Sequence, residues 1–398
     1  MKKTILIIFS FLILYPYKCA IVGLNLDGHG LSQITQGLKS ILEISHDITV
    51  LSSRSGKNTG EFDFVIFTDS ITCFKQDLTQ SLPKAKIKIA YCLWETDKLP
   101  EEWVTILNNK FDFVIVASSW FVNKYIENGV QIPIFCIPLG LDTKKLEYID
   151  YELNNNNSDK EDKFYFTCIS SFFRHKNQLL LLEVFQELFN NSDVGLILSG
   201  HAPTYDTYFN KILAKAKEYN NKNIIINSKQ LDDKEFAEII KKTSVLLSIS
   251  TGEGFSYTPR EAAALGIPTI IPANTAYWDL IENDYASIVI NCPTKIESFC
   301  ILQNKIIGNG FLVCKNNLKN ALINIYKNYN EYKKEAQAKK ELIKNSYSWQ
   351  KVNNLFTKIL EPQSWFLNSE NKITNLGIFC NDKNLIDKIN IMIESKAN

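Results

Sequence analysis

The sequence predicts an α/β protein of two domains, each built on a parallel, doubly wound sheet. Apolar, strand-like runs alternate with amphipathic stretches along most of the chain, which is typical of a parallel sheet covered by helices. The chain has 398 residues, enough for two such cores. A polar, Asn-rich stretch without periodicity, residues 151–163, divides two regions of alternation and is expected to be an exposed linker.

The first region is expected to fold as a domain of residues 20–150. Its opening strand, 20–26, runs into a Gly-rich turn and then into an amphipathic helix over 31–44. The order strand, turn, helix and strand indicates a parallel sheet. The other strands of this domain are expected at 46–52, 63–68 (which Phe62 could join), 87–93, 113–117 and 134–137.

The second region is expected to form a domain of residues 164–345. Asp232 and Asp233 are interpreted as a helix start rather than as metal ligands. Residues 291–308 fit no periodic pattern and are interpreted as an insertion near the rim of a cleft. The strands are expected at 164–169, 194–198 and 245–249, and the helices at 178–189, 233–242 and 318–332.

Composition excludes several classes of function. The net charge is +1, and no concentrated basic stripe is present, so a nucleic-acid partner is not expected. Hydrophobic residues make up 45% and charged residues 22%, which is ordinary for a globular protein. The nine cysteines contain no C-x-x-C pair, and no D-x-D motif occurs, so no metal site is expected. Such cysteine usage favours a reducing compartment.

In contrast to the cysteine usage, the N-terminal segment 1–19 has the features of a segment that directs export. Lys2 and Lys3 precede an apolar run over 5–15, which has the shape of a secretory signal. The run is shorter than the roughly 20 residues that span a bilayer. Cys19 follows bulky residues, so it is a weak candidate for lipid attachment. Three interpretations stay open: an export signal or membrane tether, an extra buried strand, and a start codon placed too early.

The most informative residue is Glu253. It lies between Gly252 and Gly254, directly after the strand expected at 245–249. The carboxyl ends of parallel strands are where such sheets present ligand-binding residues. We therefore expect the Glu253 carboxylate to contact a ligand.

A helix is expected to follow this loop. Residues 258–261 (TPRE) have the pattern of a capping box, with a hydroxyl cap, a proline and Glu261 as the third helical residue. Gly266 is expected in a left-handed conformation that ends the helix, and Pro268 prevents its continuation. A helix N-terminus attracts a phosphate. A purely structural interpretation of Glu261 stays open, since a capping role alone would explain it.

These residues resemble the donor site of retaining GT-B glycosyltransferases, the glycosyl transferases group 1 class (family 4). The resemblance implies two Rossmann-like domains facing a central cleft. It implies that Glu253 contacts the donor hexose, that backbone amides of Gly254, Phe255 and Ser256 hold the diphosphate, and that Glu261 holds the ribose. The matching positions are Glu253, Gly254, Phe255, Glu261, Ala262, Gly266 and Pro268.

The loop 170–177 (SSFFRHKN) is the expected source of positive charge. In the resembled family an arginine and a lysine five residues apart neutralise the diphosphate. Lys176 matches the lysine, but Ser171 stands where the arginine would be. Arg174 is the candidate substitute. On local grounds alone, the basic cluster could equally be a solvated surface patch.

Further candidates come from other loops. Gly28 and Gly30 match the family's glycine-rich first loop beside the donor phosphates, although no G-x-G-x-x-G is present. His29, between these glycines, is a catalytic candidate. Glu95 and His201 are candidates on the acceptor side.

The last part, 346–398, resembles family helices that cross back to the first domain. A helix is expected over 348–360. A strand at 376–380 and a helix at 383–394 follow, without a family match.

The resemblance implies transfer of a hexose from a nucleoside-diphosphate sugar to a glycan or lipid-linked acceptor, with retention, without metal or other cofactor. A cytoplasmic location, or the cytoplasmic face of a membrane with peripheral contact, fits the supply of sugar nucleotides. Two alternatives stay open: a non-catalytic relative that binds a nucleotide or glycan, and an epimerase of the same architecture.

Overall fold

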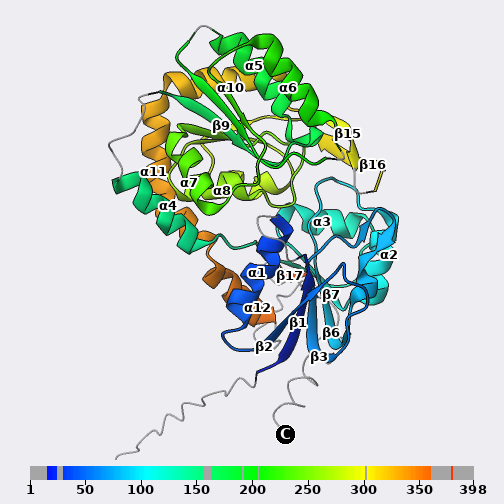
Figure 1. Cartoon of the computed structure of the whole chain (residues 1–398). Helices are drawn as coiled ribbons and strands as arrows, with labels where there is room; N and C mark the ends of the chain where they lie inside the picture. The colour runs from blue at the N-terminus through cyan, green and yellow to red at the C-terminus, as the bar shows by residue number, and fades with distance from the viewer. Residues whose placement is uncertain are drawn as a thin grey trace, which may run out of the picture.

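The computed structural model describes residues 16–24, 30–155, 163–190, 192–204, 206–300, 303–359 and 378–379. These residues form two lobes, each with helices on both faces of a sheet (Figure 1). Buried side chains form a core on each side of both sheets, and two of these clusters include residues of both lobes. The predicted α/β class with two doubly wound domains is confirmed.

The first sheet has seven strands in the order β17-β8-β7-β6-β3-β1-β2, all parallel except β17, which runs antiparallel to β8. Nearly every residue of β1, β3 and β7 is buried, as expected for a sheet covered on both faces. Its elements are β1 Lys18–Gly23, α1 Gly30–Leu42, β2 Asp47–Ser52, β3 Glu61–Phe67, β4 Thr72–Cys73, β5 Gln76–Asp77, η1 Leu78–Ser81, β6 Lys84–Tyr91, α2 Glu101–Lys110, β7 Phe113–Val116, α3 Ser119–Glu127, β8 Ile134–Cys136 and β17 Ile378–Phe379.

The second sheet has six parallel strands in the order β11-β10-β9-β12-β13-β14. Helix α7 begins with a capping box in which Asp232 accepts from the Glu235 N–H and Glu235 accepts in return. The elements are β9 Tyr165–Ile169, η3 Arg174–Lys176, α5 Gln178–Phe189, β10 Gly195–Ser199, α6 Tyr208–Tyr219, β11 Ile224–Asn227, α7 Asp233–Lys242, β12 Val245–Leu247, α8 Tyr257–Ala264, β13 Thr269–Pro272, η4 Thr275–Tyr277, α9 Trp278–Glu282, β14 Ile288–Ile290, α10 Lys315–Lys327 and α11 Tyr329–Ser346.

The predicted linker is partly helical. Helix α4, Thr143–Asn155, takes in the first five residues of the stretch 151–163. It packs along α7 of the second lobe, and Lys241 Nζ lies 2.6 Å from a carboxylate oxygen of Glu152 (Figure 1). Polarity alone suggested a loop here, but these contacts stabilise helix. The chain therefore reaches the second lobe before α4, not after it.

Two crossings between the lobes lie side by side. The Leu141 N–H donates to the Tyr347 carbonyl at 2.6 Å, and Leu141 forms a parallel bridge with Ser348. The expected helix at 348–360 is present as α12, Trp349–Ile359, which packs on α1. A Cβ added at Gly37 or Gly140 would lie 1.8 or 2.3 Å from the Trp349 indole, so both positions require glycine.

Other boundaries differ from expectation. Strand β1 begins at Lys18, and Cys19 is fully buried within it, so these two residues belong to the first sheet rather than to a leader. The single helix expected at 318–332 is two helices, α10 and α11, separated at Asn328. Residues 1–15, and the helix expected at 383–394, lie outside the described part.

The stretch 291–308, which fitted no pattern, contains most of a β-hairpin. Its strands are β15 Lys295–Cys300 and β16 Lys305–Phe311. The hairpin reaches the first lobe: Lys295 Nζ lies 2.7 Å from Asp97, and Gln303 donates to Thr72 Oγ1 at 2.8 Å. Ile307 is buried among first-lobe residues. The hairpin thus ties the two lobes together.

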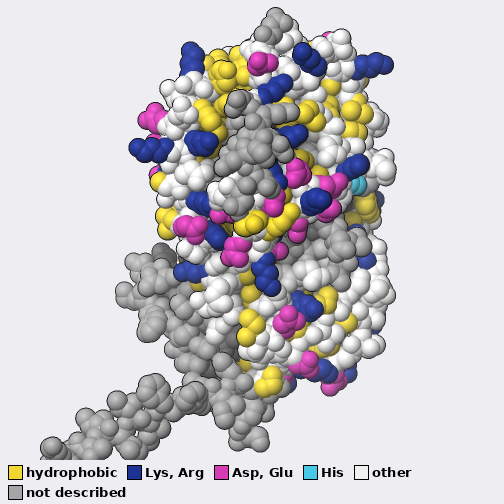
Figure 2. All heavy atoms as spheres, turned by 60° about the vertical axis from the view of Figure 1, so that its left-hand side comes forward, with side chains coloured by type: hydrophobic (Ala, Val, Ile, Leu, Met, Phe, Trp, Pro, Cys, Tyr) yellow, Lys and Arg dark blue, Asp and Glu magenta, His cyan; other side chains and the backbone are white. Residues whose placement is uncertain are grey.

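Positive and negative side chains are mixed on the face shown in Figure 2. Among the described residues, no helix has the length and apolar character needed to cross a bilayer. The eight described cysteines form no disulfide with one another.

Candidate active site

Glu253 lies where the two lobes meet. The loop that carries it follows β12, and a Cβ added at Gly252 would lie 2.0 Å from the Glu95 carbonyl oxygen of the first lobe. At Gly254 the added atom would lie 2.9 Å from Leu93 Cβ. The two glycines therefore allow the backbone of this loop to touch the opposite domain.

The Glu253 side chain is held on several sides. The backbone N–H of Glu253 donates to Thr275 Oγ1 at 2.8 Å, and Ser250 Oγ donates to Glu253 Oε1 at 2.5 Å. Lys176 Nζ donates to the same Oε1 at 2.6 Å, and Glu95 Oε1 lies 3.7 Å from Lys176 Nζ. The structure thus brings together three residues singled out from the sequence: Glu253, Lys176 and Glu95.

Lys176 is positioned by the backbone of its own loop. Asn177 has a left-handed backbone with φ of 60°, and its side chain donates to the Ile249 carbonyl at 2.9 Å. Burial alone would lower the pKa of Lys176, but the carboxylates of Glu253 and Glu95 outweigh burial and raise it above the usual lysine value. The amine is therefore a fixed positive charge at neutral pH.

The rest of the basic cluster behaves differently from expectation. Burial, and the positive charge of Lys176, lower the pKa of His175 to about 3, so its imidazole is neutral at pH 7. Its Nε2 lies 3.6 Å from a Glu95 oxygen. Arg174 is exposed, and among the described residues it forms no ion pair. Lys176 is therefore the cation of this loop that reaches the carboxylates.

The predicted capping box at residues 258–261 is wrong. Helix α8 begins at Tyr257, its N-cap is Ser256 with φ of 66°, and no side chain caps it. Glu261 is the fifth helical residue, not the third. Its carboxylate accepts from Lys145 Nζ at 2.9 Å, and only 7% of its side chain is exposed. Glu261 is therefore not a capping residue.

Lys145 was missed by the sequence analysis. It comes from α4, whose residues were assigned to the end of the first domain and to the linker, and no local pattern marks it. Its Nζ lies 3.9 Å from the centre of the Phe236 ring and the same distance from Asp233. Burial would lower the pKa of Lys145, but Glu261 raises it, so the amine stays charged.

Several candidates do not join this cluster. Gly28 and His29 lie outside the described residues. Gly30 is the first residue of α1, and an added Cβ would meet nothing within 4 Å. His201 follows β10, as expected, with an exposed side chain. The Ser171 carbonyl accepts from Gln178 at 2.9 Å.

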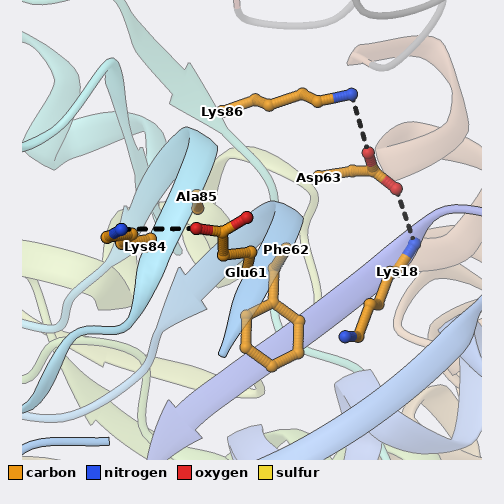
Figure 3. A pocket seen from close by; sticks show the side chains of 7 residues that line it. All are labelled: Lys18, Glu61, Phe62, Asp63, Lys84, Ala85 and Lys86. Carbon is orange, nitrogen blue, oxygen red and sulfur yellow. Dashed lines mark hydrogen bonds and ion pairs between the residues drawn. The ribbon is translucent and has the colours of Figure 1, made fainter. Parts of the chain in front are cut away.

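A separate hollow of about 380 Å³ lies at the far end of the first sheet. Figure 3 shows its lining, where Lys84 pairs with Glu61, and Asp63 accepts from Lys86 and from the Lys18 backbone. These residues stand at the starts of β1, β3 and β6. Parallel sheets bind ligands at the opposite, carboxyl ends of their strands. This hollow is therefore not the candidate active site.

The sequence model of the family described as Glycosyl transferases group 1 matches residues 150–341. This range includes Lys176, Glu253 and Glu261. The second domain is a glycosyl transferases group 1 domain. Among curated proteins, the chain is 21% identical over 282 residues to Uncharacterized protein 356 of Sulfolobus islandicus rod-shaped virus 1, covering 68% of this chain and 75% of that protein.

Solved glycosyltransferases share the whole two-domain architecture, which is the GT-B fold. Sucrose-phosphate synthase from Thermosynechococcus elongatus is 13% identical, with a TM-score of 0.63 over 87% of this chain and 98% of that one. HepE from Anabaena, in complex with UDP and glucose, is 12% identical, with a TM-score of 0.57 over 86% and 99%. A trehalose-6-phosphate synthase studied for glycosyl transfer with retention is 10% identical, with a TM-score of 0.62 over 86% and 98%.

Proposed function

We propose that this protein transfers a hexose from a nucleoside-diphosphate sugar to a hydroxyl group of a glycan or lipid-linked acceptor, with retention and without a metal. The observation that carries the proposal is the cluster of Lys176, Glu253 and Glu95 at the meeting of the two lobes. Lys176 and Glu253 lie within the residues that match the glycosyl transferases group 1 model, and Glu95 faces them from the first lobe. The UDP and glucose bound by HepE support UDP-glucose as the first donor to test.

The chemistry needs a stabilised leaving group. The bond between the anomeric carbon and the β-phosphate oxygen breaks, the acceptor oxygen bonds to that carbon, and the acceptor proton leaves with the diphosphate. Lys176 supplies positive charge for the departing diphosphate. A preorganised cation in a site shielded from water stabilises such charge more than a solvated one does.

The two glutamates bind different parts of the donor. Glu253, oriented by Ser250 and Thr275, accepts hydrogen bonds from hexose hydroxyls. Glu261 accepts from the ribose hydroxyls, with Lys145 holding one of its oxygens. In the structure each carboxylate is paired with a lysine, so donor binding exchanges part of each ion pair for hydrogen bonds to the sugars.

The experiment begins with binding. The full chain is titrated with UDP, GDP, ADP and dTDP and followed by thermal unfolding, where a ligand at 100 times its dissociation constant stabilises by about 2.7 kcal/mol. Transfer is then measured by mass spectrometry of an acceptor library with the matching sugar nucleotides. Glu253→Ala should abolish transfer and keep the fold, whereas Glu282→Ala, an exposed glutamate on α9, should change neither. Full activity of Glu253→Ala would refute the proposal.

A non-catalytic binding protein is the second candidate. Ser171 in place of the family's arginine, and the exposed position of Arg174, favour it. Such a protein would bind a nucleotide and convert no donor in the presence of any acceptor. A single glycosylated product would exclude it.

A further inference from the structure

Arg260 is a charged side chain that the proposed reaction does not use. It lies on α8, one residue before Glu261, and its side chain is fully buried. Its guanidinium donates to three backbone carbonyls. Nη1 contacts those of Phe255 and Ser256, the latter at 3.0 Å, and Nη2 contacts that of Ala276 at 2.9 Å.

These contacts fix the direction of the neighbouring amides. The described chain contains no cis peptide bond. In a trans peptide, the carbonyl of one residue and the N–H of the next point in opposite directions. Because the carbonyls of Phe255 and Ser256 point to Arg260, the N–H groups of Ser256 and Tyr257 point away from it. Within the described residues neither N–H donates a hydrogen bond. Two aligned free amides at a left-handed turn form an anion-binding concavity.

The charge of Arg260 is only partly balanced. The one described carboxylate within 4 Å is that of Asp279, with Oδ2 at 3.7 Å from Nη2. The rings of Phe255 and Tyr347 lie 4.1 and 5.1 Å from the guanidinium carbon, and the Nε atom is buried without a hydrogen bond. A buried cation is costly unless an anion compensates it. A diphosphate at the Ser256 and Tyr257 amides would supply that anion from the other side of the loop.

Asp279 also connects Arg260 to the first lobe. Its Oδ1 accepts from Ser119 Oγ at 2.7 Å and from the Ser119 N–H at 3.3 Å, at the start of α3. Arg260 and Asp279 therefore link the loop to the first lobe through an unbroken series of contacts.

We propose that Arg260 is a positioning residue for the diphosphate. It aims the amides of Ser256 and Tyr257 at the phosphates and supplies, from beneath the loop, the positive charge that Ser171 cannot. This inference rests on the proposed function and adds to it a residue from another part of the site.

The test compares a nucleoside diphosphate with its uncharged nucleoside. Dissociation constants for UDP and uridine are measured calorimetrically for the full chain, or for the diphosphate and nucleoside of whichever base binds. Arg260→Lys keeps the charge but cannot hold three carbonyls. We expect it to weaken UDP binding about 10-fold or more, on the scale of a charge-assisted hydrogen bond, and uridine binding less than twofold. Arg260→Gln should do at least as much.

Equal weakening of UDP and uridine, or no change in either, would overturn the inference. If neither Arg260 variant folds by circular dichroism, Asp279→Asn decides. This change removes the carboxylate that balances Arg260, so UDP should bind at least twofold tighter with uridine unchanged. Unchanged or weaker UDP binding by this variant overturns the inference. If the unmodified protein binds none of the four diphosphates, the proposed function fails and the inference falls with it. Unaltered UDP binding by Arg260→Lys removes the inference alone.

Discussion

Glu253 and Glu261 lie eight positions apart, and each carboxylate accepts from a lysine, at 2.6 and 2.9 Å. Their surroundings nevertheless differ. Glu253 is on a loop and lies against the first lobe; its carboxylate also accepts from Ser250, and its backbone N–H donates to Thr275. Glu261 is on a helix, and its partner Lys145 lies on α4, which packs on the same lobe.

The different surroundings of Glu253 and Glu261 suit different functions. A carboxylate at the meeting of two domains can act on a donor sugar and an acceptor that approach from opposite sides. A carboxylate enclosed within the second domain suits the proposed role of holding the nucleotide. Changes around Glu253 should therefore affect turnover and the contact between lobes, whereas changes around Glu261 should affect nucleotide affinity.

The largest effect is expected at Lys176. Lys176→Met leaves Glu253 without its cation and removes the charge that we propose faces the diphosphate. We expect UDP affinity to fall by about 10- to 150-fold, which corresponds to a loss of about 1.5–3 kcal/mol. Calorimetric titration measures it. Arg174→Met, at the neighbouring exposed arginine, is the control, and an equal loss there would show that the basic cluster acts only as a diffuse patch.

The contact between lobes can be tested at Gly252. In Gly252→Ala the added methyl group collides with the Glu95 carbonyl, so we expect unfolding free energy to fall by about 1–3 kcal/mol, as for other overpacked sites. Denaturant unfolding measures this. Gly30→Ala, where an added Cβ meets nothing within 4 Å, should change stability little. Equal effects of the two substitutions would contradict the packing argument.

A smaller effect is expected at Lys145. Lys145→Met frees the Glu261 carboxylate to turn, and we expect UDP affinity to fall about fivefold, or roughly 1 kcal/mol, as for one hydrogen bond. Because Glu261 is proposed to hold the ribose, the preference for UDP over its 2′-deoxy form should also shrink. The control is Lys144→Met, at an exposed lysine beside it. An unchanged preference would remove Lys145 from the ribose site.

The smallest effect concerns His175. Its pKa of about 3 in the fold lies below the value near 6.5 in an unfolded chain. Between these values the unfolded state binds more protons, so His175 makes stability rise with pH over this window and fall on acidification. The melting temperature of the wild type should therefore fall further between pH 7 and pH 5 than that of His175→Gln. Equal losses would show that His175 is protonated in the fold.

Local signals predicted the second domain best. Helices α5 and α7 begin and end where expected, because apolar periodicity and, for α7, the Asp232 cap define them in sequence. Glu253, Lys176 and Glu95 were each singled out, because loops at the carboxyl ends of parallel strands converge.

The remaining features depend on contacts between distant residues. The capping box was wrong because α8 begins at Tyr257, two residues before the predicted first residue Pro259, where Arg260 holds the carbonyls of Phe255 and Ser256. The pairing of Lys145 with Glu261 spans 116 positions and leaves no local pattern. The hairpin β15–β16 was missed because β15 alternates between exposed and half-buried residues, which gives a weak strand signal.

The lobes are joined in two physically different ways, toward opposite sides of Figure 1. At α12 the join is the chain itself, with Leu141 bridged to Ser348. At the hairpin it includes the ion pairs of Lys295 with Asp97 and of Lys305 with Glu102, whose lysines are about half exposed. Salt weakens exposed ion pairs and leaves a covalent crossing untouched. Raising the ionic strength should therefore weaken the hairpin side and leave the α12 side unchanged, while the buried contacts of Ile307 and Gln303 keep the hairpin on the first lobe.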